Sequence, residues 1–117
     1  MKTLNNNSKK RGLLAIALVS ILFIFSSCTS TNPPAANEVF IQSMAFSPAT
    51  LTITAGTTVK WTNKDGVAHT VTSDNTGLFD SGNISTNGTY SHTFTTAGTY
   101  NYHCTYHSSM TAKVVVN

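Results

Sequence analysis

From Val39 to the end of the chain, hydrophobic and polar residues alternate with the two-residue period of strands that bury one face. Val59 and Trp61 share one face of such a segment, and Tyr90 and Phe94 share one face of another. The pattern predicts strands over residues 39–46, 51–54, 59–62, 67–72, 90–95, 99–104 and 111–116. Because the single Trp lies on an alternating strand, we expect Trp61 to fill the core.

Turns that contain glycine separate these segments. They are Ala55-Gly56, Lys64-Asp65-Gly66 and Ala97-Gly98. The stretch 74–88 is rich in Asn, Asp, Ser and Gly, so we expect irregular loops there, anchored by Leu78, Phe79 and Ile84. No window of this part of the sequence has helical periodicity. Short strands at close spacing predict a single all-β domain, an antiparallel β-sandwich or barrel.

The first 27 residues have the composition of a secretory signal peptide. Positive charge at Lys9, Lys10 and Arg11 precedes an apolar run, residues 13–25, that is too short to span a bilayer comfortably. The sequence F-S-S-C that ends at Cys28 resembles a bacterial lipoprotein processing site, although a phenylalanine replaces the usual aliphatic residue. We therefore expect an exported protein, periplasmic or on the cell surface, that is anchored to the membrane by a lipid on Cys28.

Residues 28–37 contain a proline pair among small polar residues, which is typical of a flexible linker, and the folded domain is expected over residues 38–117. Without the leader, three lysines and four acidic residues remain, for a net charge of −1, so no basic patch for nucleic acid is left. A disulfide is not expected, because an acylated Cys28 cannot pair with Cys104. A free thiol in an oxidising compartment is a liability unless a metal occupies it.

Three donors of the soft or borderline kind lie in one short loop between two predicted strands. They are Cys104, His107 and Met110, in the sequence Y-N-Y-H-C-T-Y-H-S-S-M. Two imidazoles, one thiolate and a weak axial thioether are the ligands of blue-copper centres, so this loop lacks one imidazole. Zinc is a second possibility, but structural zinc sites seldom use methionine.

Three other histidines could supply the missing imidazole. His103 adjoins Cys104 in a strand, so its side chain points to the opposite face. His92 lies between Tyr90 and Phe94, where a structural role is favoured. His69 begins a predicted strand after a turn and is distant from the loop in sequence, as expected of a ligand that tertiary folding brings in.

These segments resemble the cupredoxin family, most closely its amicyanin and plastocyanin branch. The likeness spans residues 39–117 and includes F-S-P-A-T-L-T, A-G-T-T-V-K-W-T-N, A-G-T-Y and the loop itself, whose Cys-x2-His-x2-Met spacing is characteristic of amicyanin. The resemblance implies a Greek-key fold with one type 1 copper ion. By matching position, it implies that His69, Cys104 and His107 form the trigonal plane and that Met110 is the axial ligand.

The chain departs from this branch around the loop. Thr70 follows the first histidine where asparagine is usual, and we expect it to hydrogen-bond to the backbone of the Cys104 loop, with Thr105 also beside the ligands. Tyr106, Ser108 and Ser109 replace the prolines and the bulky apolar residue of amicyanin. The likeness therefore does not extend to the partner, although Tyr106 is a candidate docking residue.

The leading functional hypothesis is a blue copper protein that carries single electrons between transient protein redox partners. The resemblance implies that the His107 edge faces solvent and passes the electrons. We expect a monomer, and no enzyme, because the chain has no nucleophile-base pair and no open metal position. The alternatives are a copper carrier or storage module without stable redox cycling, and an immunoglobulin-like structural sandwich without a metal.

Overall fold

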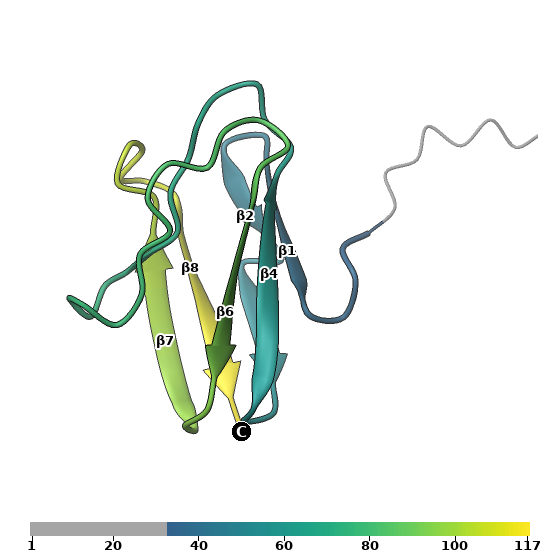
Figure 1. The fold of residues 1–117 in the computed structure, drawn as a ribbon, viewed down its shortest axis with the longest axis vertical. Helices are drawn as coiled ribbons and strands as arrows, with labels where there is room; N and C mark the ends of the chain where they lie inside the picture. Colours follow the sequence, from purple (N-terminus) through teal and green to yellow (C-terminus); the bar gives the residue numbers. More distant parts are fainter. Residues whose placement is uncertain (1–32) are drawn as a thin grey trace, which may run out of the picture. The chain divides into compact units, whose positions relative to one another are not determined.

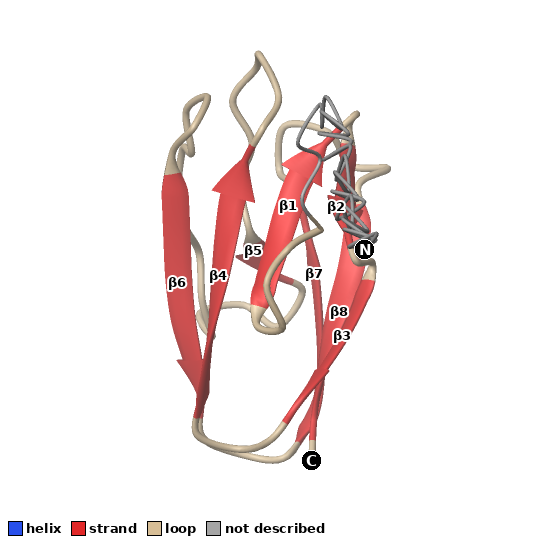
Figure 2. Cartoon of the chain, turned by 90° about the vertical axis from the view of Figure 1, so that its right-hand side faces the viewer, coloured by secondary structure: helices blue, strands red, loops and turns tan. Residues whose placement is uncertain are grey.

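Two four-stranded sheets face each other in the computed structural model, which describes residues 33–117 (Figure 1). The first sheet has the order β2-β1-β4-β6 and consists of β1 (Glu38–Gln42), β2 (Ala45–Ser47), β4 (Thr57–Asn63) and β6 (Thr89–Phe94). The second has the order β3-β8-β7-β5 and consists of β3 (Thr50–Ile53), β8 (Thr111–Val116), β7 (Gly98–His103) and β5 (Thr72–Ser73). Figure 2 shows β6, β4 and β1 side by side in this order.

The prediction of an all-β sandwich is confirmed, but the sheets are mixed rather than purely antiparallel. β1 pairs with β4 in parallel, with Val39 opposite Trp61, and β3 pairs with β8 in parallel, with Leu51 opposite Val114. The other four pairs of described strands are antiparallel. Because β3 belongs to the opposite sheet, the chain leaves the first sheet after β2 and returns to it at β4. β4 therefore runs parallel to β1.

Side chains from both sheets fill the space between them. The buried hydrophobic residues include Val39, Ile41, Val59, Trp61, Phe79, Phe94, Tyr102, Val114 and Val116. Trp61 has no exposed surface, as predicted, and its indole N–H donates to the Tyr102 hydroxyl at 3.2 Å. This hydrogen bond joins β4 of one sheet to β7 of the other.

Three local predictions are wrong. The predicted strand 39–46 is split into β1 and β2 by a turn at Ser43 and Met44, whose φ angles are 53° and 59°. The predicted strand 67–72 is mostly loop, because its backbone pairs with the stretch 74–88 instead of a strand: Val71 N–H donates to the Ser81 hydroxyl and Ser81 N–H to the Val71 carbonyl. Leu78 is 44% exposed and anchors nothing, whereas Phe79 and Ile84 are buried as predicted.

The predicted signal peptide, Cys28 and the first part of the predicted linker lie outside the described residues. Asn37 was assigned to the linker, yet its carbonyl accepts a hydrogen bond from Lys60 N–H of β4 at 3.0 Å. In the part of the chain that the structure describes, no helix is long and apolar enough to cross a membrane.

The turn between β1 and β2, the loop between β4 and β5, and the loop between β7 and β8 gather at one end of the sandwich, at the top of Figure 1. The predicted ligands lie in the latter two loops.

Candidate metal centre

Short backbone hydrogen bonds shape the loop that joins β7 to β8. Cys104 N–H donates to the Met110 carbonyl at 3.0 Å, which closes the loop at its base. Within it, His107 N–H donates to the Cys104 carbonyl at 3.3 Å and Met110 N–H to the His107 carbonyl at 2.9 Å. These bonds form two successive tight turns, so backbone hydrogen bonds hold the three donor residues in place without a metal.

His69 reaches the same place from the loop between β4 and β5. Its backbone exchanges two hydrogen bonds with Ile84, at 3.1 Å and 2.8 Å, as in a strand pair one residue long. The His69 side chain has no exposed surface. A buried imidazole on an anchored backbone has little freedom to move.

The structure brings His69, Cys104 and His107 together, with one donor atom of each within 4.8 Å of the others. The Cys104 sulfur lies 3.7 Å from His69 Nδ1 and 3.6 Å from His107 Nδ1. Bonds of about 2.0 Å to nitrogen and about 2.3 Å to sulfur, at about 120° to each other, would separate the two donor atoms by about 3.7 Å. The three side chains therefore fit around one metal ion in a trigonal arrangement.

The Cys104 sulfur is buried and already accepts a hydrogen bond. Thr70 N–H donates to it at 3.3 Å. The Thr70 hydroxyl accepts from Thr105 N–H at 2.8 Å and lies 2.7 Å from the Thr105 hydroxyl. The expected contact between Thr70 and the Cys104 loop is thus present, and it ties the two loops that carry the donors to each other.

Comparison with known proteins points to one family. A sequence model of the cupredoxin-like domain matches residues 14–116. Amicyanin-alpha from Methylorubrum extorquens is 38% identical over 94 residues, which are 72% of this chain and 74% of that protein. Amicyanin from Paracoccus denitrificans is 34% identical over 115 residues, 89% of this chain and 88% of that protein. The chain belongs to the cupredoxin-like family.

The fold agrees with this relationship. The structure of a Cu(I) form of an amicyanin variant matches this cupredoxin with a TM-score of 0.65 at 37% identity, over 68% of this chain and 80% of that one. The chemistry of the donor set fits copper as well: Cys104 and the two imidazoles suit a type 1 site. Met110, the proposed axial ligand, is 3% exposed at the end of the same loop.

Two histidines of this cupredoxin lie outside the cluster. His103 of β7 is partly exposed, and its Nδ1 atom lies 2.5 Å from a carboxylate oxygen of Asp74. His92 of β6 packs against the rings of Phe79 and Phe94, with ring centroids 4.9 Å and 4.8 Å away. Burial lowers the pKa of His92 below its ordinary value, as expected for an imidazole among aromatic rings.

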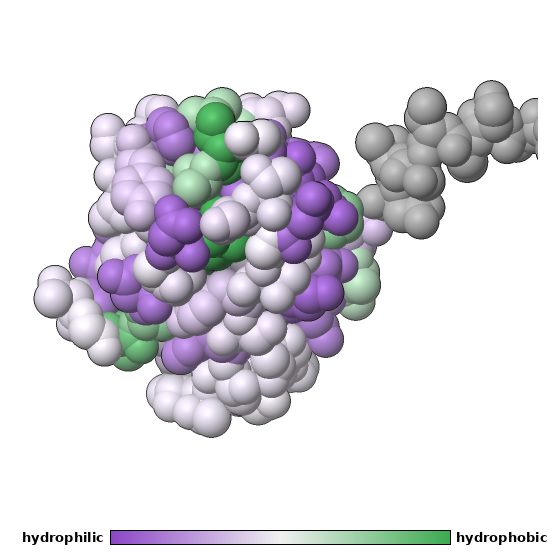
Figure 3. All heavy atoms as spheres, turned by 45° about the horizontal axis from the view of Figure 1, so that its top comes forward, coloured by the Kyte–Doolittle hydropathy of each residue, from purple (hydrophilic) through white to green (hydrophobic). Residues whose placement is uncertain are grey.

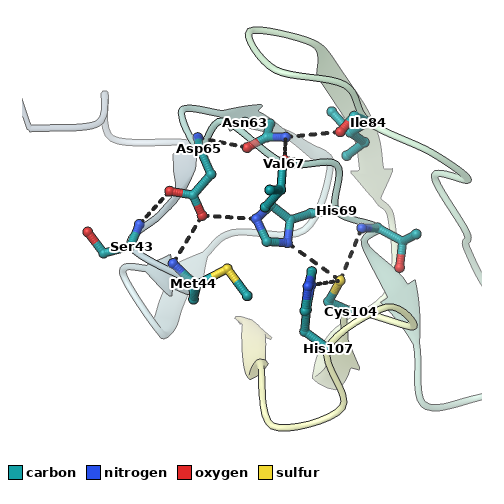
Figure 4. A network of polar contacts seen from close by, with 10 residues as sticks. Ser43, Met44, Asn63, Asp65, Val67, His69, Ile84, Cys104 and His107 are labelled. Carbon is teal, nitrogen blue, oxygen red and sulfur yellow. Dashed lines mark hydrogen bonds and ion pairs between the residues drawn. The ribbon is translucent and has the colours of Figure 1, made fainter.

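Asp65, which the sequence predicts only as part of a turn, lies next to the cluster. Its carboxylate accepts hydrogen bonds from Ser43 N–H at 2.7 Å and Met44 N–H at 3.0 Å, and it lies 2.9 Å from His69 Nε2 (Figure 4). Burial of this carboxyl favours a raised pKa, but the hydrogen bonds from Met44, His69 and Ser43 outweigh burial and lower the pKa below 3.8. Its position four residues before His69 is the only sequence signal that could have revealed it.

The loop surface is polar where it meets solvent. Its exposed residues are Thr105, Tyr106, Ser108 and Ser109, and His107 is partly exposed. Tyr106 is 54% exposed, and its hydroxyl donates to the side-chain oxygen of Asn83 at 3.3 Å. Figure 3, which brings this end of the molecule forward, shows hydrophobic residues only in small separate areas among polar ones.

Proposed function

We propose that this cupredoxin carries single electrons by means of one copper ion that His69, Cys104 and His107 would hold, with the thioether of Met110 as a fourth, weaker ligand. The observation that carries the proposal is the preformed cluster, in which the Cys104 sulfur lies 3.6–3.7 Å from one nitrogen of each imidazole. Two of the three side chains are buried, and with Met110 as a fourth ligand the donor set would leave no position open for a substrate.

The ligands have distinct roles. When bound, copper supplies the one-electron chemistry between Cu(II) and Cu(I). Cys104 would bind the copper as the thiolate and provide the strongest contact, while the thioether of Met110 would favour the reduced state. His107 is the partly exposed imidazole, so its edge is the proposed exit for the electron. The hydrogen-bonded loops hold these residues in place, and little of the protein must move when the charge changes.

The test is repeated oxidation and reduction of the copper-loaded protein in the presence of a chelator. We expect reversible one-electron cycling with the copper retained over many cycles. Copper that passes quickly to the chelator, without stable cycling, would instead support a carrier or storage role.

We also propose that the protein is exported and anchored by a lipid on Cys28, with residues 28–37 as a tether. The support is the apolar leader and the F-S-S-C sequence. Mass spectrometry of the mature protein should find an acylated Cys28 at its N-terminus, and Cys28→Ser should release the protein from the membrane. A mature chain that begins at another residue would contradict this proposal.

The proposed partners are proteins that donate and accept electrons in brief encounters, and the protein is proposed to be a monomer. Redox encounters use small, weak interfaces, and the polar surface around His107 suits such contacts. Nucleic acid is not a proposed partner, because the domain has no excess of basic residues.

A further inference from the structure

We infer that Asp65 is a positioning residue for the metal centre: it holds His69 in the tautomer that leaves Nδ1 free to bind a metal, and it fastens this ligand to the turn between β1 and β2. Only the predicted change in reduction potential depends on the proposed copper site. The tautomer of His69 and its connection to the turn concern the protein without a metal.

The hydrogen bond between His69 and the Asp65 carboxylate determines which nitrogen of the neutral His69 ring carries the proton. An ionised Asp has acceptors but no donor. His69 Nε2 lies 2.9 Å from one carboxylate oxygen of Asp65, so Nε2 must carry the proton. Nδ1 of the neutral ring then has its lone pair free. This is the atom that faces the Cys104 sulfur, 3.7 Å away.

Asp65 is itself held in place. Its N–H donates to the side-chain oxygen of Asn63 at 2.9 Å. The Asn63 amide nitrogen donates to the carbonyls of Val67 and Ile84, at 2.8 Å and 3.0 Å, and Asn63 has no exposed surface. Ile84 also pairs with the backbone of His69. Figure 4 shows the resulting network around His69, which links the end of β4 to the backbone that carries the ligand.

The same carboxylate stabilises an unfavourable turn. Ser43 and Met44 both have left-handed φ angles, which residues other than glycine adopt only at a cost. Their two N–H groups point at Asp65 and donate to it at 2.7 Å and 3.0 Å. One side chain thus satisfies three donors, two from the turn and one from the ligand.

A carboxylate bonded to a metal-binding imidazole makes that imidazole a stronger donor, and loss of such a partner costs about 10- to 100-fold in metal affinity. The negative charge favours the more positive Cu(II) state. We therefore expect Asp65→Asn to weaken Cu(II) binding about tenfold more than Cu(I) binding, which corresponds to a rise of about 60 mV in reduction potential. The carboxamide has one acceptor oxygen and one donor nitrogen, so it cannot accept all three hydrogen bonds.

The first experiment needs no variant. Nitrogen-15 NMR of the metal-free wild-type protein, recorded at a pH where the His69 ring is neutral, should find the ring proton on Nε2. A proton on Nδ1 instead would overturn the inference whether or not the protein binds copper, which separates its failure from failure of the proposed function.

The second experiment compares Asp65→Asn with Glu38→Gln, which removes the same charge at the start of β1, where Glu38 contacts Thr62 and Lys60. Asp65→Asn should disturb the Nε2–H tautomer of His69 and raise the potential, whether or not amide exchange at Ser43 and Met44 becomes faster. Glu38→Gln should change none of these. A potential and tautomer unchanged in Asp65→Asn, with only faster exchange in the turn, would reduce Asp65 to a turn anchor and overturn the inference.

Discussion

At the residue scale, the donors around Cys104 differ in what they contribute. The thiolate is the one ligand whose bond to copper is strongly covalent, whereas a distant thioether mainly adjusts the balance between the oxidation states. The loop that supplies both is closed by the bond from Cys104 N–H to the Met110 carbonyl. Substitution of either side chain should therefore leave the backbone of the loop intact and report on the metal.

Cys104→Ser should abolish the intense red absorption of the Cu(II) protein completely. Met110→Gln should keep that absorption but lower the reduction potential, because a harder oxygen ligand favours Cu(II). Absorption spectra and potentiometry of the two variants check this. Equal effects from both would contradict the division into trigonal and axial ligands.

Thr70→Val should loosen the connection between the two ligand loops. The variant keeps the bond from Thr70 N–H to the Cys104 sulfur but removes the hydroxyl that accepts from Thr105 N–H. Loss of one partly buried hydrogen bond should cost about 1 kcal/mol of stability, measured by urea unfolding. Thr93→Val is the control, because its hydroxyl pairs with Thr58 on an exposed part of the sheet. A similar loss in both variants would argue against a special role for Thr70.

The residue types and spacing, together with the resemblance to cupredoxins, predicted the three side chains that meet. The Cys104 loop lies between two strands whose alternation is plain, and the resemblance to cupredoxins singled out His69 among the other histidines. Asp65 was not predicted as part of the site, because its spacing of four residues from His69 was its only local signal. Its role depends on Ser43 and Met44, 22 and 21 residues away, and tertiary contacts of that kind leave no local pattern.

At the element scale, the predictions succeeded for strands such as β8. They failed at a turn without the usual signal residues and in a segment whose hydrogen-bond partner is an irregular loop instead of a strand. Residues 111–116 form β8 over the predicted range. The turn at Ser43 and Met44 was missed because neither residue is Gly or Asn, the usual signals of left-handed backbone. The segment 67–72 has the composition of a strand, but its hydrogen-bond partners are Ile84 and Ser81 of an irregular loop.

Ser43→Gly should stabilise the protein by about 0.5 to 1 kcal/mol, since glycine adopts a φ of 53° without strain, although it adds some entropy to the unfolded chain. Ser43→Ala should not, because the Cβ atom remains. Urea unfolding of the metal-free proteins measures both. Equal stability of the two variants would mean that the turn carries no conformational strain at this residue.

At the scale of the whole molecule, the hydrogen bond between Trp61 and Tyr102 connects the two sheets through the core. Tyr102 is 1% exposed, and burial raises its pKa to about 12, partly offset by the bond from Trp61. A folded-state pKa above the ordinary value of 10 means that the folded protein holds this proton more tightly than the unfolded chain. The resulting stability is complete below pH 10 and is lost as the pH rises toward 12.

The stability of the wild-type protein should thus fall by about 2 to 3 kcal/mol more than that of Tyr102→Phe between pH 10 and pH 12, because the variant has no hydroxyl to ionise at this position. Tyr100→Phe is the control, since it removes a tyrosine hydroxyl that donates to the Thr96 carbonyl but leaves the buried Tyr102 hydroxyl in place. Unfolding curves across this pH range provide the measurement. Parallel pH profiles for wild type and Tyr102→Phe would refute the assignment.

The central claim is that His69, Cys104 and His107 form one copper centre with a thiolate ligand, and the absorption spectrum of the protein loaded with one equivalent of Cu(II) tests it most directly. The account predicts an intense absorption band in the red from charge transfer between the Cys104 thiolate and copper. A Cu(II) protein with only the weak absorption of nitrogen and oxygen ligands, or one that binds no copper, would contradict it.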